Sequence, residues 1–170
     1  MLKIEEASQR AVSLAPRYLN TDLQSGLFFA SARGGVFLIC EADATTKWAV
    51  MISDPKFRAW RLLKDAQHWQ GIFVPDVEIL VEPGEFSQGP RRDPQPGDLV
   101  LAEGVVGILS TPENAMWPQP IRWADSELDQ EVVHPPMSFS RWSVARRDPS
   151  GRYERLVSYG FTDNDLDRGL

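Results

Sequence analysis

The sequence has little of the chemistry from which metal and redox sites are built. Among its 170 residues there is one cysteine, Cys40, and there are two histidines, His68 and His134. One cysteine excludes an internal disulfide bond and any metal site made of several thiolates, and two isolated histidines lack the spacing at which zinc ligands occur. Cys40 lies inside an apolar run, so we expect a buried and unreactive thiol. The sequence predicts neither a metal site nor a cofactor.

Long hydrophobic runs and catalytic motifs are also missing. No apolar run approaches the roughly 18 residues of a membrane-spanning helix, and the first residues, MLKIEEASQRAVSLAP, lack the apolar core of an export signal. The glycine-rich motifs of dinucleotide and phosphate sites and the GxSxG motif of hydrolases do not occur. These absences predict a cytoplasmic protein with no membrane partner. A catalytic site would have to combine residues from distant parts of the chain.

Positive charge is scarce relative to negative charge. The chain has 24 Asp and Glu against 18 Lys and Arg, a formal net charge of −6. Binding to nucleic acid depends on Lys and Arg that neutralise phosphates, so we expect no nucleic-acid partner. An acidic surface would instead suit a basic protein partner. The candidate acids lie in two strips of the sequence: Glu78, Glu82 and Glu85 in the first, and Asp125, Glu127, Asp129 and Glu131 in the second.

The densest apolar stretch runs from Gly26 to Ser53 and predicts three strands. They cover residues 27–31, 36–42 and 48–52, which are rich in Val, Ile, Phe and Trp and are separated by turn residues. The middle strand is apolar at consecutive positions, which is typical of a sheet covered on both faces. We therefore expect the core here, with a helix packed over one face.

Two segments predict helices. Residues Lys3 to Ala15 have an amphipathic pattern that ends at Pro16. Ser53-Asp54-Pro55 is a helix-start signal, and aromatic residues follow it at helical spacing, so we predict a broken helical segment from Pro55 to Gln70. In a narrower alternative only Asp54 to Trp60 is helical. Together with the strands, these segments predict an α+β fold with a mostly antiparallel sheet.

The second half of the chain alternates between strands and loops. Residues 72–74 and 77–81 predict a strand broken at Pro75-Asp76, and residues 99–110 predict two short strands or one kinked strand. Residues 111–114 predict the start of a loop or a single helical turn, which leads past Trp117 to Trp123. Residues 138–147 and 152–161 predict a hairpin around the turn Asp148-Pro149-Ser150-Gly151.

The whole chain, residues 1–170, is predicted to form one domain. Pro83 to Asp98 is dominated by Pro, Gly and charge, so we expect a flexible loop within that domain. The acidic residues 162–170 are expected to be loosely held.

These observations leave two functional hypotheses. The first is a non-catalytic protein that binds another protein, for example an inhibitor or immunity-like partner of a basic target, through the seven acids named above. The second is a small-molecule enzyme or ligand-binding protein with an aromatic pocket, lined by Trp60 and Trp69 with Arg58, Arg61 and Asp76 as polar contacts. The first is favoured because no catalytic spacing is present. The sequence does not fix an oligomeric state.

Overall fold

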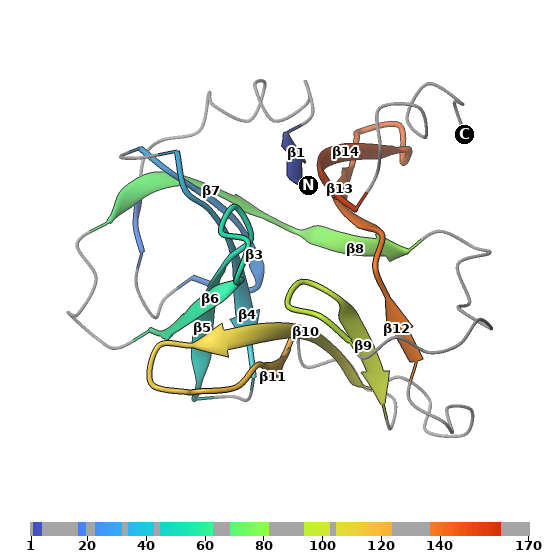
Figure 1. The fold of residues 1–170 in the computed structure, drawn as a ribbon. Helices are drawn as coiled ribbons and strands as arrows, with labels where there is room; N and C mark the ends of the chain where they lie inside the picture. The colour runs from blue at the N-terminus through green and yellow to red at the C-terminus, as the bar shows by residue number, and fades with distance from the viewer. Residues whose placement is uncertain are drawn as a thin grey trace.

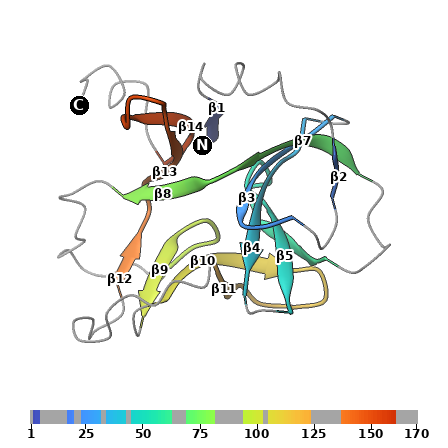
Figure 2. The same cartoon turned by 180° about the vertical axis from the view of Figure 1, so that it is seen from behind.

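Every regular element that the structure describes is a β-strand, and the strands form two sheets (Figure 1). The structure is a computed structural model that describes residues 2–4, 17–19, 23–31, 34–42, 45–62, 69–81, 94–102, 105–123 and 137–160. Figure 2 shows the same arrangement from behind, with the β13-β14 hairpin of the smaller sheet above strands β9 and β12 of the larger sheet, and with β3, β4 and β5 of the larger sheet to the side.

The smaller sheet is antiparallel and has the strand order β1-β14-β13-β8. Its centre is the hairpin of β13 and β14, whose register shifts at a bulge between Val144 and Ala145. The hairpin turn is fixed by the Asp148 carboxylate, which accepts hydrogen bonds from the backbone N–H of Ser150 and of Arg152. The four strands are β1 (Leu2–Ile4), β8 (Val77–Val81), β13 (Trp142–Arg147) and β14 (Tyr153–Tyr159).

The larger sheet has the order β12-β9-β10-β6-β5-β4-β3-β7-β2, and β11 also pairs with β10. All its pairings are antiparallel except that of β6 with β10, which is parallel. Its strands are β2 (Arg17–Tyr18), β3 (Gly26–Ala30), β4 (Val36–Glu41), β5 (Lys47–Met51), β6 (Arg58–Arg61), β7 (Gln70–Pro75), β9 (Leu99–Ala102), β10 (Val105–Pro112), β11 (Gln119–Arg122) and β12 (Met137–Phe139).

Strands β7 and β8 follow each other through a single residue and connect the two sheets. β7 pairs with β3 in the larger sheet, and β8 pairs with β13 in the smaller one. Asp76 lies between them with φ of 55°, in the left-handed region that a non-glycine residue rarely adopts. Figure 1 shows the two strands as one green path that crosses from the larger sheet to the smaller one.

Strand β4 contributes to two hydrophobic cores because its side chains alternate between the two faces of the sheet. Val36, Leu38 and Cys40 belong to the main core, which also contains residues of the smaller sheet. Phe37 and Ile39 belong to a second core on the opposite face. The prediction that both faces of this strand are covered is thus confirmed, but the expected helix over one face is not present among the described residues. Among the described residues, the second face is covered by Leu19, Leu23 and Leu62.

The predicted α+β class is wrong, because the described part of the chain is all β with no helix. In the predicted N-terminal helix, Lys3 and Ile4 belong to strand β1, while residues 5–15 lie outside the described residues. In the predicted Pro55 to Gln70 helical segment, Arg58 to Arg61 form strand β6, and Gln70 begins β7. Residues 63–68 of that segment lie outside the described residues.

The helix-start signal at Ser53-Asp54-Pro55 forms a turn instead of a helix. The Asp54 carboxylate accepts a hydrogen bond from the Lys56 backbone N–H at 2.8 Å, as it would at a helix N-cap. Phe57 then has φ of 48°, which ends any helical continuation, and its side chain enters the main core. Trp60, three residues later, packs against the second core on the other face. Phe57 and Trp60 are three residues apart, which fits one face of a helix, but in the structure they pack on opposite faces of a sheet.

Several strand predictions are confirmed. The three strands between residues 27 and 52 form the antiparallel meander β3-β4-β5. The break at Pro75-Asp76 is the passage from β7 to β8, and residues 99–110 form two strands, β9 and β10. The hairpin around Asp148 to Gly151 is present as predicted. Residues 94–98 of the predicted loop form a turn against the main core, while residues 83–93 lie outside the described residues.

Candidate functional site

Glu78 is the one predicted acidic binding residue that the structure describes. Its side chain is exposed on β8, but both carboxylate oxygens have partners within the protein. One accepts a hydrogen bond from Arg147 Nε at 3.2 Å, and the other accepts one from the Tyr153 hydroxyl at 2.7 Å. These two hydrogen bonds, the one from Tyr153 foremost, lower the pKa of Glu78. The other six acids, Glu82, Glu85, Asp125, Glu127, Asp129 and Glu131, lie outside the described residues.

The charge of the described residues has the opposite sign to that of the chain. They include twelve Lys or Arg and eight Asp or Glu, a formal charge of +4, whereas the complete sequence has a formal net charge of −6. The excess of acid therefore belongs to the segments outside the described residues. An acidic binding surface on the described strands is not supported by this distribution.

The two predicted pocket tryptophans do lie together. The Trp60 and Trp69 rings are 5.5 Å apart between centroids in an edge arrangement, and Phe37 packs against both, at 6.1 and 5.1 Å. The Arg58 guanidinium lies 5.8 Å from the centroid of the Trp60 ring and forms an ion pair with Asp54 at 2.6 Å. This arrangement places aromatic rings and one arginine along the edge of the second core, with Trp69 still 37% exposed.

The other two predicted pocket residues are separated from each other. Arg61 is exposed at the end of β6, on the same strand as Arg58 and Trp60. Asp76 is exposed beyond the far end of β7, while Trp69 immediately precedes that strand. Seven extended residues span roughly 20 Å, so Asp76 does not join the tryptophans in one pocket.

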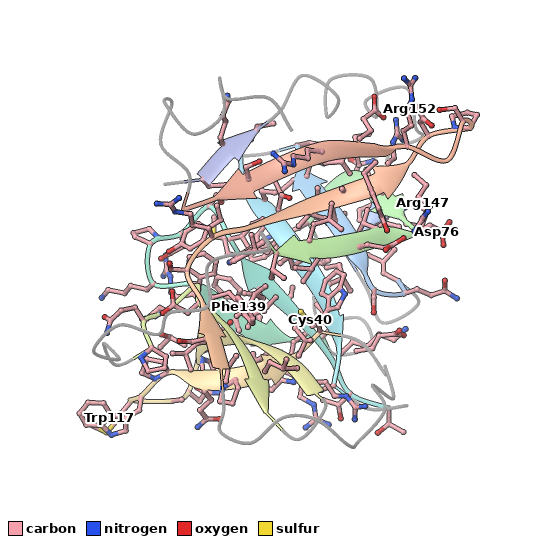
Figure 3. All side chains as sticks on the ribbon, turned by 90° about the vertical axis from the view of Figure 1, so that its right-hand side faces the viewer. Cys40, Asp76, Trp117, Phe139, Arg147 and Arg152 are labelled. Atoms are coloured by element: carbon pink, nitrogen blue, oxygen red, sulfur yellow. The ribbon has the colours of Figure 1, made fainter. Side chains whose placement is uncertain are left out.

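The most exposed apolar side chains lie on a feature to which the sequence assigned no role. Residues 113–118, here called the hairpin tip, connect β10 to β11. Within the tip, Met116 is 87% exposed and Trp117 is 74% exposed. Figure 3 shows Trp117 at the end of a loop, pointing away from the rest of the molecule. Large apolar side chains at such exposure in a turn are candidates for contact with another molecule.

Backbone hydrogen bonds hold the base of the hairpin tip in place. The Ala115 N–H donates to the Pro112 carbonyl at 3.0 Å, and the Glu113 N–H donates to the Ala59 carbonyl at 2.9 Å. The second bond continues the parallel pairing of β10 with β6, in which Pro112 lies opposite Ala59. The tip is therefore attached both to its own hairpin and to β6.

Because β6 and β10 are parallel, the two strands run in the same direction past Ala59. The hairpin tip consequently leaves the sheet beside the last residues of β6, Trp60 and Arg61. Figure 1 shows the ends of the two strands next to each other, with the turn from β10 to β11 beyond them. We call Met116 and Trp117 together with the neighbouring β6 residues Arg58, Trp60 and Arg61 the tip surface. Within β6, Arg58 and Trp60 lie on the face of the second core and Arg61 lies on the face of Ala59.

One sequence signal could have pointed to the hairpin tip. Met116 and Trp117 lie between Asn114 and Pro118 in a segment with neither helical nor alternating apolar periodicity, so nothing predicts their burial. The parallel contact with β6 could not be read from sequence, because it joins segments about fifty residues apart.

The described residues contain neither a cluster of metal ligands nor a reactive cysteine. Within them, no three His, Cys, Asp or Glu side chains come together as a metal site requires. The Cys40 thiol is fully buried, and burial raises its pKa, which disfavours the reactive thiolate. No helix in the described ranges has the length and apolar character needed to cross a membrane.

In its described residues the protein is all β, with two sheets and an exposed aromatic hairpin tip beside an arginine-bearing strand. Comparisons of the chain with protein-family models, with curated proteins and with solved structures find no match.

Proposed function

We propose that this protein acts by binding another protein without catalysis, and that the hairpin tip is the anchor of the contact. The observation that carries the proposal is the exposure of Met116 and Trp117 at 87% and 74%. Trp, Met and Arg are the residue types enriched at protein interfaces, and Trp and Arg dominate the residues that contribute most binding energy. The tip surface consists almost entirely of these types.

The hairpin tip can also contribute a favourable free energy of binding. Transfer of an exposed indole into an apolar pocket contributes about 3 kcal/mol before the costs of association. Those costs are lower for a segment that is already ordered, and the backbone bonds of Glu113 and Ala115 order the tip in the free protein. Met116 adds an adaptable apolar side chain next to the indole.

The aromatic pocket of the alternative hypothesis has less support. Trp60 and Trp69 pack against each other and against Phe37, so much of their ring surface already serves the second core. The hypothesis of a basic target depends on acids that lie outside the described residues. The one described acid of that set, Glu78, already forms an ion pair with Arg147 and accepts a hydrogen bond from Tyr153. We therefore assign the binding to the tip surface.

Affinity capture with a tip variant tests the proposal. The immobilised protein, its Trp117→Ser variant and its Tyr18→Ser variant are each incubated with extract of the source cell, and the retained proteins are quantified. Tyr18 is an aromatic control, 58% exposed on strand β2. We expect a protein that the wild type and Tyr18→Ser retain equally and that Trp117→Ser retains at least about tenfold less, the loss of about 1.4 kcal/mol.

A set of captured proteins that is the same for all three baits would contradict the proposal. Thermal unfolding of the variants provides the folding control. Since Trp117 is exposed, its substitution should leave the free energy of unfolding within about 0.5 kcal/mol of the wild type.

A further inference from the structure

Two exposed cations, Lys56 before β6 and Arg61 at its end, have no partner within the described part of the protein. Lys56 precedes β6 and Arg61 ends it, and both side chains are exposed without an ion pair or hydrogen bond to a described residue. Several of the other described Lys and Arg side chains have ion pairs. Among these, Arg146 pairs with Glu154, Arg147 with Glu78 and Arg152 with Asp148.

The acids near Lys56 and Arg61 do not neutralise them. Asp54 binds Arg58 through both Nε and Nη2, at 2.7 and 2.6 Å. Glu41, on strand β4, forms an ion pair with Lys47 at 3.3 Å. Glu113, at the base of the tip, is the remaining described acid close to β6. Within the described residues, Lys56, Arg61 and Glu113 have no ion pair, so unpaired positive charge exceeds unpaired negative charge in this region.

The positions of these cations relative to the tip are set by the strand register. Thr111 lies opposite Arg58 and Pro112 lies opposite Ala59, so β10 meets β6 between Lys56 and Arg61. Lys56 lies in the turn before β6 and Arg61 ends the strand, so the two cations lie on either side of this pairing. A partner that covers Trp117 and reaches along β6 would meet both charges at the edge of the contact.

We propose that the partner receives the hairpin tip in an apolar pocket that is bordered by carboxylates, so that the contact is between a basic surface of this protein and an acidic surface of the partner. This inference rests on the proposed function. It predicts an acidic partner, whereas the negative net charge of the chain suggests a basic one. Arg61 and Lys56 act at the rim, where charges mainly steer association, while Met116 and Trp117 supply the apolar contact.

Association kinetics test the inference with the protein that the capture experiment recovers as Trp117-dependent. The association rate of this purified protein is measured with the wild type, Arg61→Glu and Arg152→Glu at about 20 mM and about 300 mM salt, where screening lengths differ severalfold. Arg152 is the matched control, because its substitution changes the net charge equally, its side chain is 83% exposed, and it lies in the hairpin turn of the smaller sheet.

We expect the wild-type association rate to fall with salt and Arg61→Glu to slow association at low salt about tenfold, against less than about twofold for Arg152→Glu. Lys56→Glu should behave like Arg61→Glu. Equal effects of Arg61→Glu and Arg152→Glu, or faster association of Arg61→Glu, would overturn the inference and leave the proposed function standing.

Failure of the proposed function gives a different result. If no captured protein depends on Trp117, both the function and this inference fall. Phosphatidylcholine vesicles with and without phosphatidylserine complete the test, because the same residues could contact a lipid surface. If the vesicles bind the wild type but not the Trp117→Ser variant, and no protein is captured in a Trp117-dependent way, then the tip contacts a membrane surface. That result would overturn both proposals.

Discussion

Gly97 shows how one residue fixes the end of the Pro-rich segment to the main core. Its carbonyl accepts a hydrogen bond at 2.8 Å from the indole Nε1 of Trp142, a fully buried side chain. Its φ of 96° lies in the region that favours glycine, and Phe57 and Tyr159 pack close to its α-carbon. The turn at residues 94–98 is therefore tied to the smaller sheet through a backbone group that only a glycine can place there.

Substitution Gly97→Ala should lower the free energy of unfolding by more than about 2 kcal/mol, because a Cβ there combines backbone strain with overpacking. The added Cβ would lie 2.5 Å from Phe57 Cε2 and 2.7 Å from the Tyr159 hydroxyl. Gly151→Ala is the matched control, since Gly151 also has positive φ, 82°, but has no atom within 4 Å of such a Cβ. It should lose only about 1 kcal/mol. Urea unfolding measures both, and equal losses would contradict the packing at Gly97.

Tyr153 lowers the pKa of Glu78 at the surface of the smaller sheet. Its hydroxyl donates to the Glu78 carboxylate at 2.7 Å and accepts from Arg147 Nη2 at 2.6 Å. The hydrogen bond from Tyr153 is the largest cause of the lowered pKa of Glu78. Since the folded-state pKa is the lower one, the stabilisation is present above the ordinary glutamate value of 4.5 and is lost as pH falls through the folded-state pKa.

The variant Tyr153→Phe should raise the pKa of Glu78 toward its ordinary value, because the carboxylate loses its first donor but keeps Arg147. The pH dependence of the carboxyl carbon shift in NMR spectra measures the change. Tyr18→Phe, on β2 of the larger sheet, serves as control and should leave the Glu78 titration unchanged. A titration curve that is the same in Tyr153→Phe and wild type would show that the hydrogen bond does not form in solution.

At the scale of elements, the sequence predicts strands well where turn residues bound an apolar run. The meander β3-β4-β5 and the β13-β14 hairpin involve neighbouring segments, so short turns and alternating side chains were enough to predict them. The error at β6 has a physical cause. The turn that Asp54 stabilises uses the same carboxylate to N–H bond as a helix cap, and Phe57 and Trp60 fit helical spacing. A helix and the observed turn followed by β6 differ in where these aromatic side chains pack, because in the structure Phe57 and Trp60 contribute to cores on opposite faces of the sheet.

The corner between β7 and β8 depends on the backbone of Asp76. At φ of 55° a β-branched residue is strained, whereas glycine is not. Asp76→Val should therefore lower the free energy of unfolding by about 2 kcal/mol, and Asp76→Gly should change it by less than about 1 kcal/mol, since relief of strain is offset by the larger entropy of the unfolded chain. Chemical denaturation measures both values. If Asp76→Val were no less stable than Asp76→Gly, the corner would not have this conformation.

At the scale of the whole molecule, the sequence gives the total charge but not its distribution. The formal net charge of −6 suggested a basic partner, yet the described residues carry a formal charge of +4. Lys56 and Arg61, which have no ion pair with a described residue, acquire meaning only when parallel pairing brings β6 alongside β10, the strand that leads into the hairpin tip. Such a site combines segments that are distant in sequence, and periodicity or composition of one segment cannot reveal it.

Trypsin should distinguish the strand framework from the rest of the chain. Lys47, Arg58 and Arg146 lie within strands that pair on both sides, where the chain cannot adopt the extended, exposed conformation that a protease needs. The sequence from Pro83 to Asp98 predicts early cleavage after Arg91 or Arg92, because it combines proline, glycine and charge with almost no apolar side chain.

Limited digestion followed by mass spectrometry should therefore show residues 1–91 or 1–92 among the first fragments, together with the remainder of the chain. The double substitution Arg91→Gln, Arg92→Gln is the control, and it should remove these fragments while the free energy of unfolding remains within about 0.5 kcal/mol of the wild type. First cleavage after Lys47 would instead require that β5 separate from β4 and β6 under native conditions. Because β5 contributes Ala49 and Val50 to opposite cores, such an opening would expose both cores at once, and the described arrangement of the larger sheet could not be correct.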